Sequence, residues 1–171
     1  MGSCYEYTPK IPLPLWYTSS MEHQQAVQFT TTDQHGNTIT LEQYRGKKVV
    51  LYFYPKDMTP GCTTEALGFQ DLYNTFKKHN TEILAVSKDN QASHQKFCDK
   101  HGLEFPLLVD EDGTLVQAYG VWKEKSMYGK TYMGISRESF LIDEHGVMVK
   151  HWDNVKPATH PQEVLDYITN M

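Results

Sequence analysis

Cys62 stands where a β-type segment gives way to a helix, a position that turns a thiol into a nucleophile. The apolar run over residues 49–54 ends at Pro55, and after a short turn a helical pattern begins near Pro60. Thr59 suits the N-cap of that helix and Pro60 suits its first position, so Cys62 falls in the first turn. Backbone N–H groups there lack acceptors within the helix, and the helix dipole favours negative charge. A thiol so placed is expected to ionise more readily than a free one, which indicates thiolate chemistry.

The structural alternative for Cys62 is a small buried side chain that packs as a hydrophobe, the commoner fate of a lone cysteine. The segment Pro60-Gly61-Cys62-Thr63-Thr64 is polar, and its members are poor core residues. We therefore expect the thiol not to be buried and favour the functional interpretation.

Two blocks of sequence carry a resemblance to a known family. Residues 52–57, Tyr-Phe-Tyr-Pro-Lys-Asp, together with residues 59–63, Thr-Pro-Gly-Cys-Thr, resemble the active-site segment of the peroxiredoxins. The closest likeness is to the peroxiredoxin Q subfamily, also called bacterioferritin comigratory proteins, and residues 127–143 resemble the same subfamily. The resemblance, which runs from about residue 26 to the C-terminus, implies a thioredoxin-like fold. It also implies a thiol-dependent peroxidase that reduces hydrogen peroxide and organic hydroperoxides without a metal, haem, flavin or selenium cofactor.

The same resemblance implies a role for individual residues. Cys62 matches the peroxidatic nucleophile, and Pro55 and Thr59 match the family pattern Pro-x-x-x-Thr-x-x-Cys, in which the proline shields the pocket and the hydroxyl contacts the peroxide. Arg137 matches the catalytic arginine that holds the thiolate and the peroxide oxygens. Without the resemblance, Pro55 could simply end the strand, Thr59 could simply cap the helix, and Arg137 could be a solvated surface charge. Glu65, one turn beyond the cysteine, is given a structural role, because a carboxylate near a helix N-terminus is favourable.

The position of a second, resolving cysteine departs from many subfamily members. Those proteins carry it five residues after the first, where this chain has Leu67. Other members place it on the next helix, where this chain has Cys98, so the resemblance implies a Cys62–Cys98 disulfide recycled by thioredoxin or a similar dithiol protein. We expect the two thiols to lie beyond disulfide range until the active-site helix unwinds locally. The alternatives are that Cys98 packs in the core or that an external thiol resolves a one-cysteine enzyme.

Composition limits the classes of function. The chain has 171 residues, 39% of them hydrophobic and 12% aromatic, and a net charge of −5 with no basic run. It is therefore globular, and neither nucleic acid nor a membrane is an expected partner. Residues 1–20 lack the basic start and apolar core of a signal peptide, and the odd count of three cysteines, with Cys4 unassigned, points to a reducing compartment. We expect a cytoplasmic protein, and the resemblance favours a monomer.

Hydrophobic patterns and turn residues predict the order of elements. We expect a β-hairpin over residues 27–41, strands at 49–54, 83–86 and 106–109, helices from residue 60 and over 91–101, a short helix near 115–119, a second hairpin over 140–149 and a last helix from Pro161. This order predicts an α/β protein with a mixed central sheet, helices on both faces and an N-terminal hairpin, which is the thioredoxin-like layout. We expect an irregular arm over residues 1–24 and one domain over residues 25–171.

Two other functions use the same cysteines. A thioredoxin-fold metal carrier would bind its ion through Cys62, Cys98 and a histidine, but Ala66 stands where copper-handling relatives of the fold carry a second cysteine. His94, Cys98 and His101 share one face of the predicted second helix, and we interpret both histidines as surface residues. A disulfide oxidoreductase generally needs Cys-x-x-Cys, which the chain lacks.

Overall fold

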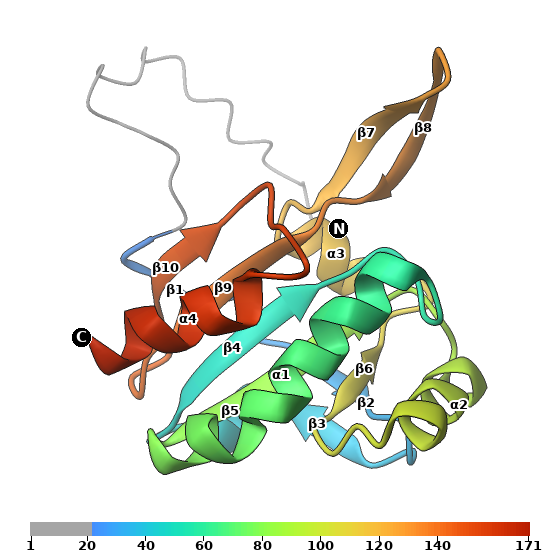
Figure 1. The fold of residues 1–171 in the computed structure, drawn as a ribbon. Coiled ribbons are helices and arrows are strands. Elements are labelled where there is room, and N and C mark those ends of the chain that lie inside the picture. Colours follow the sequence, from blue (N-terminus) through green and yellow to red (C-terminus); the bar gives the residue numbers. More distant parts are fainter. Residues whose placement is uncertain (1–21) are drawn as a thin grey trace, which may run out of the picture.

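A six-stranded mixed sheet forms the centre of the computed structural model, which describes residues 22–171 (Figure 1). In spatial order its strands are β1 (Gln24–Gln25), β10 (Val147–Trp152), β9 (Glu138–Ile142), β4 (Lys48–Phe53), β5 (Thr81–Ser87) and β6 (Leu107–Val109). The pairs β4–β5 and β5–β6 are parallel, whereas β9 runs antiparallel to β4 and to β10. The predicted mixed sheet, with a parallel part joined to an antiparallel hairpin, is confirmed.

Strand β4 separates the two hydrophobic clusters of the core. Its alternate side chains point to opposite faces: Val50 and Tyr52 belong to one cluster, and Leu51 and Phe53 belong to the other. Such an uninterrupted apolar run is expected of a strand covered on both faces. The central position of β4 fixes its C-terminal end, and that end leads directly to the segment carrying Cys62.

Helices cover both faces of the sheet, as predicted. Helices α1 (Pro60–Lys78), α2 (Gln91–His101) and α4 (His160–Thr169) contribute to one cluster, with α1 and α4 packed side by side (Figure 1). Gly68 allows this close packing, because a Cβ atom there would lie 2.8 Å from Pro161 Cγ. The short helix α3 (Thr114–Ala118) packs on the opposite face, together with the hairpin of β2 (Thr30–Thr32) and β3 (Thr38–Thr40). A 3-10 turn, η1 (Glu42–Tyr44), follows β3.

A further hairpin, formed by β7 (Trp122–Met127) and β8 (Lys130–Ile135), was not predicted. It projects from the body of the molecule (Figure 1). Most of its side chains are exposed on both faces. The turn at Tyr128 and Gly129 has positive φ angles of 52° and 76°, as a tight hairpin turn requires. Without a buried face, these strands lack the alternation of polar and apolar residues that marks a strand in a sequence. Strand β8 nevertheless matters for the site, since it leads to Arg137.

Only the last three residues of the predicted N-terminal arm lie in the part of the chain that the structure describes. The rest of the arm, including Cys4, lies outside the described residues. Gln24, which the prediction placed in the arm, belongs to strand β1 and pairs with Met148 of β10. The division of the chain at residue 25 stays a prediction. Among residues 22–171, no helix has both the length and the apolar character needed to cross a bilayer.

Candidate active site

Cys62 is the third residue of helix α1, which follows the end of β4 after a short loop. Thr59 is the N-cap and Pro60 the first helical residue, as predicted. The first intrahelical bond is donated by the Thr63 N–H to the Thr59 carbonyl, at 2.9 Å. The Cys62 N–H therefore precedes the regular bonding pattern, and the sulfur lies at the positive end of the helix dipole.

The expectation that Cys62 is not buried was wrong, since only 2% of the residue is exposed. The neighbouring Thr64 is exposed and Gly61 and Thr63 are half-buried, as their polar character suggested. Cys62, however, begins a buried stripe that continues at Glu65, Ala66 and Phe69, spaced as the inward face of a helix requires. The helical period, not the composition of the turn, decides which way the thiol points.

Arg137 lies between β8 and β9 and reaches the thiol from a distant part of the sequence. Its Nη2 donates to Cys62 Sγ at 3.4 Å, and its Nη1 donates to Glu65 Oε2 at 2.5 Å. The side chain is only 17% exposed, so its charge acts on the sulfur with little screening. A Cβ atom at Gly61 would lie 3.2 Å from Nη2, and glycine at this position leaves room for the guanidinium. The structure thus places Arg137 against Cys62, and the catalytic role implied by the family resemblance stays a prediction.

Glu65 has a more specific position than the general structural role given to it from the sequence. It is fully buried, one of its oxygens accepts the bond from Arg137, and Oε1 has no hydrogen-bond partner. Burial raises the pKa of this carboxyl group to about 7 against the opposing charge of Arg137. Glu65 therefore fixes the orientation of the Arg137 guanidinium, and its own carboxyl group has a pKa near neutral pH.

Thr59 and Pro55 flank the loop that precedes α1. Thr59 occupies the N-cap, yet its side chain does not cap the helix: Oγ1 donates to the Lys56 carbonyl at 2.8 Å. With its proton so directed, the hydroxyl oxygen keeps its lone pairs free to accept a bond from a ligand. Pro55 directly follows the apolar strand and is half-buried. The structure thus places both residues on the segment that leads into Cys62.

Cys98 lies on helix α2 and belongs to the same hydrophobic cluster as Cys62. Both thiols are free, and Cys98 is 6% exposed. Burial, with smaller contributions from Asp57 and Asp99, raises the pKa of the Cys98 thiol to about 12. In this conformation Cys98 keeps its proton at neutral pH and has no partner for a disulfide.

The interpretation of His94 as a surface residue was wrong. His94 is fully buried, with Nδ1 2.8 Å from Asp57 Oδ2 and Nε2 2.9 Å from the Leu108 carbonyl oxygen. A signal was present in the sequence: residues 94, 97 and 98 have the i, i+3, i+4 spacing of a buried helical stripe, and all three are buried. His101, at the end of the helix, is half-buried and stacks edge-on against Phe97.

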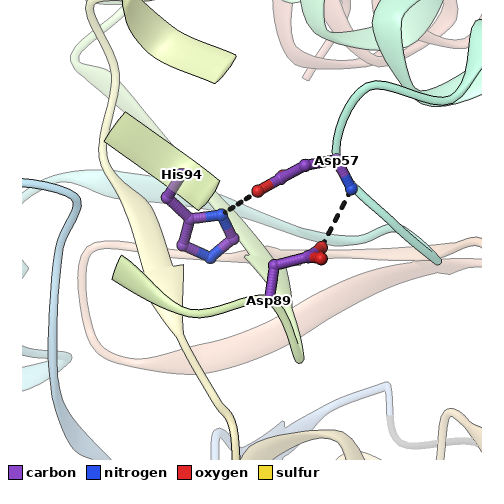
Figure 2. A group of neighbouring side chains, drawn as sticks. All are labelled: Asp57, Asp89 and His94. Atoms are coloured by element: carbon purple, nitrogen blue, oxygen red, sulfur yellow. Dashed lines mark hydrogen bonds and ion pairs between the residues drawn. The ribbon is translucent and has the colours of Figure 1, made fainter. Parts of the chain in front are cut away.

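Asp57, Asp89 and His94 form the group with the composition of a metal site within residues 22–171. Their potential ligand atoms lie within 4.8 Å of one another, and Figure 2 shows the ring and the two carboxylates converging. The group contains neither Cys62 nor Cys98. The alternative of a metal carrier built on the two cysteines therefore has no support in this arrangement.

A thioredoxin-like sheet that presents a cysteine at the start of a helix, beneath an arginine, defines the class of thiol-based peroxidases. A family model described as the AhpC/TSA family matches residues 23–151. The chain belongs to this family, and the predicted membership in the peroxiredoxins is confirmed.

Individual relatives agree with this assignment. The chain is 48% identical over 148 residues to peroxiredoxin Bcp of Bacillus subtilis, covering 86% of this chain and 94% of the relative. It is 42% identical over 143 residues to peroxiredoxin Bcp of Escherichia coli, covering 84% and 92%. Among solved structures, the bacterioferritin comigratory protein of Xanthomonas campestris, studied for alkyl peroxide reduction, superposes with a TM-score of 0.79 at 43% identity over 83% of this chain and 90% of that one. The thioredoxin-like fold class is confirmed.

Proposed function

We propose that this peroxiredoxin reduces hydrogen peroxide and organic hydroperoxides at Cys62, that Cys98 resolves the oxidised cysteine, and that a thioredoxin-type dithiol protein recycles the disulfide. The observation that carries the proposal is the contact of 3.4 Å between Arg137 Nη2 and Cys62 Sγ at the N-terminus of α1. A guanidinium and a helix dipole both favour the anionic form of the sulfur, which is the reactive form.

In the first step the Cys62 thiolate attacks one oxygen of the peroxide. The S–O bond forms as the O–O bond breaks, giving Cys62–SOH and an alkoxide or hydroxide that takes up a proton and leaves as alcohol or water. The peroxide oxygen is reduced and the sulfur is oxidised by two electrons. Negative charge moves from sulfur to the leaving oxygen, so a group that faces both atoms lowers the barrier most.

Arg137 supplies that group. Its planar fork already engages Cys62 and Glu65, and a peroxide seated against the sulfur meets the remaining donors of the same guanidinium. Thr59 Oγ1 accepts the hydrogen bond of the peroxide hydroxyl, and Pro55 limits the access of water to the reacting atoms. Glu65 acts through Arg137, by fixing its orientation, and we treat it as a positioning residue.

Resolution requires Cys98 to reach the sulfenic acid. The reaction is Cys62–SOH with Cys98–SH giving Cys62–S–S–Cys98 and water, so that no outside oxidant is needed. Because the two thiols are free and occupy different helices, the first turn of α1 must unwind. Gly61, Thr63 and Thr64 are half-buried or exposed, so their release costs little buried apolar surface, and we expect this turn to open locally and to expose Cys62. Attack by Cys98 also requires release of its thiol from the burial that raises its pKa.

The burial of Cys98 also favours one alternative, a one-cysteine enzyme in which an external thiol attacks Cys62–SOH directly. The resolving role is preferred because Cys98 and Cys62 share one side of the sheet and one hydrophobic cluster. Reduction by a thioredoxin-type protein, action in the cytoplasm and a monomeric state are further parts of the proposal, supported by the resemblance to the peroxiredoxin Q subfamily. The single domain over residues 25–171, after an arm at residues 1–24, belongs to it as well.

Peroxide consumption coupled to thioredoxin and thioredoxin reductase tests the function directly. Hydrogen peroxide and cumene hydroperoxide are both expected to be consumed catalytically, and Cys62→Ser is expected to consume neither. Insulin reduction and Zn²⁺ titration of the same preparations test the two other functions considered for these cysteines. Catalytic insulin reduction or stoichiometric metal binding by the two cysteines, without peroxide consumption, contradicts the proposal.

A further inference from the structure

Asp57 lies in the loop that links β4 to α1 and is the centre of a buried hydrogen-bond network. The Tyr54 hydroxyl donates to Oδ1 at 2.6 Å and the Ser93 hydroxyl donates to Oδ2 at 2.8 Å. The His94 Nδ1 atom lies 2.8 Å from Oδ2, and Figure 2 shows the ring directed toward the Asp57 carboxylate. The backbone N–H of Asp57 donates to Asp89 Oδ2 at 2.9 Å. Asp57 is thus held by Tyr54, directly after β4, and by residues just before and in the first turn of α2.

The His94–Asp57 contact lies in a site closed to solvent. The side chains of His94 and Asp57 are 0% and 1% exposed. Since a carbonyl oxygen only accepts, Nε2 donates to Leu108, and the remaining ring nitrogen, Nδ1, faces the carboxylate. Nδ1 and Oδ2 lie within hydrogen-bond distance, so the ring has a protein partner on each side. His94 consequently joins three segments: the active-site loop, helix α2 and strand β6.

This network explains the three converging side chains without an ion. Both ring nitrogens of His94 and both oxygens of Asp57 already have protein partners. Asp89 Oδ2 likewise accepts from the Ser87 hydroxyl at 2.6 Å. A metal would have to displace these bonds, and we assign the network to positioning.

The network holds together two segments, the loop before Cys62 and helix α2, which must separate in the proposed resolving step. Met58, next to Asp57, has a φ angle of 65°, a left-handed conformation that is unfavourable for a residue with a side chain. Cys62 follows four residues later, and on the other side of the network Cys98 lies one helical turn after His94. The contacts of Asp57 hold a strained turn against the helix that carries the second thiol.

We propose that the His94–Asp57 pair is a positioning device for the resolving step, which keeps the loop before Cys62 docked on α2 and sets how readily Cys62–SOH reaches Cys98. This inference rests on the resolving role of Cys98 proposed above. Cys62–SOH has two fates: it forms the disulfide with Cys98 and releases water, or it reacts with a second H₂O₂ to give Cys62–SO₂H and water. Loosening the pair favours the disulfide and weakens the docked site that reacts with the first peroxide.

Two amides separate the two bonds of His94. In His94→Gln the amide N–H replaces Nε2 and keeps the bond to Leu108, but the bond to Asp57 is lost. In His94→Asn the amide N–H replaces Nδ1 and keeps the bond to Asp57, but the bond to Leu108 is lost. Both variants lack the imidazole ring, so each is the matched control for the other. Ser93→Ala removes a single bond to Asp57 outside the ring and serves if a His94 variant does not fold.

The experiment measures, by intact mass, the ratio of Cys62–Cys98 disulfide to Cys62–SO₂H over a series of H₂O₂ concentrations, together with the rate of the first oxidation and the thermal midpoint. His94→Gln is expected to raise the H₂O₂ concentration for half-overoxidation by roughly three- to tenfold, the factor of one net hydrogen bond, and to slow the first oxidation. Ser93→Ala should change the H₂O₂ concentration for half-overoxidation and the rate of the first oxidation in the same directions but by smaller factors. His94→Asn should stay close to the parent in both quantities.

The possible failures are distinguishable. If the parent forms the disulfide and the Gln and Asn variants partition alike, or both merely follow their thermal midpoints, the positioning role of the pair is overturned alone. If the parent gains one oxygen at Cys62 and forms no Cys62–Cys98 bond, the resolving role of Cys98 is overturned and this inference with it.

Discussion

Cys62 and Cys98 are both almost completely buried, yet the regions around them have opposite effects on a negative charge. Cys62 lies at the start of a helix with the Arg137 guanidinium 3.4 Å from its sulfur. Cys98 lies near the end of a helix, where burial and, to a smaller extent, nearby aspartates raise the pKa of its thiol to about 12. Equal burial does not mean equal reactivity: the charges and dipoles that surround a thiol decide whether it attacks as an anion or waits as a thiol.

The comparison also assigns an order to the two reactions. In the proposed mechanism, Cys62 reacts with peroxide in the docked conformation, whereas Cys98 reacts only after local opening exposes it. The proposed movement would then both bring the sulfurs together and relieve the burial that raises the pKa of Cys98. Changes that alter the charge around one cysteine should leave the step of the other intact.

Removal of Arg137 is expected to have the largest effect. Arg137→Ala should lower the second-order rate of Cys62 oxidation by about 10²–10³, the usual effect of losing one preorganised donor to a developing charge. Arg137→Lys keeps a positive charge but loses the planar pair of donors, and its oxidation rate should lie between those of the parent and of Arg137→Ala. Competition for H₂O₂ against a reference peroxidase measures the rate, and Arg45→Ala, at an exposed arginine paired with Glu42, is the control. An Arg137→Ala enzyme with near-normal oxidation would remove this residue from the site.

Cys98→Ser should affect the resolving step and leave the reaction of Cys62 with peroxide unchanged. Thioredoxin-coupled turnover is expected to fall by about tenfold or more, since the internal thiol at high effective concentration is lost, while the first oxidation of Cys62 persists. Leu67→Cys offers a sharper version, because residue 67 is exposed and lies five residues after Cys62 on the same helix. In the Cys98→Ser background it should restore part of the turnover. Unchanged turnover in Cys98→Ser would make Cys98 a bystander.

Thr59→Val keeps the shape of the side chain and removes the oxygen assigned to the peroxide. We expect the oxidation rate to fall by about tenfold, the effect of roughly one hydrogen bond. Thr64→Val is the matched control, because the Thr64 hydroxyl donates to a helix carbonyl at 3.0 Å and is exposed. Stopped-flow oxidation of both variants is the measurement. Equal rates for the two would show that Thr59 serves the loop and not the substrate.

Glu65→Gln should have the smallest effect on the reaction and a distinctive effect on stability. The folded protein raises the pKa of Glu65 from 4.5 to about 7, so it binds this proton more tightly than the unfolded chain does. The contribution of Glu65 to stability therefore declines as pH rises from about 4.5 to 7, and the uncharged amide removes that decline. Urea unfolding at pH 5 and pH 8 should show the variant gaining on the parent by on the order of 1–3 kcal/mol.

The control for this prediction is Glu111→Gln, at an exposed position. Its stability relative to the parent is expected to stay the same at both pH values. A Glu65→Gln variant that keeps a constant difference from the parent would contradict the raised pKa.

The sequence predicted the elements that have a buried face and failed where that signal is missing. Helix α2 was predicted over its full extent, residues 91–101, and in the structure it has a stripe of buried residues and ends at Gly102 in the left-handed conformation. Hairpin β7–β8 was missed because both of its faces are exposed and no buried alternation could reveal it.

The site was predictable only in part. Cys62, Thr59 and Pro60 follow from local rules for the start of a helix, which act within a few residues. Arg137 is 75 residues from Cys62 in the sequence, and only the resemblance to a family pointed to it. The buried pairs Glu65–Arg137 and Asp57–His94 depend on tertiary packing, which no local pattern encodes.

Intact mass of the reduced protein after one equivalent of H₂O₂, with a peptide map under non-reducing conditions, tests the central claim most directly. The account predicts the loss of two hydrogens and a linked peptide that contains Cys62 and Cys98. A stable gain of one oxygen at Cys62 without that link would contradict the division of roles between the two cysteines. No rapid change at Cys62 would contradict its assignment as the nucleophile.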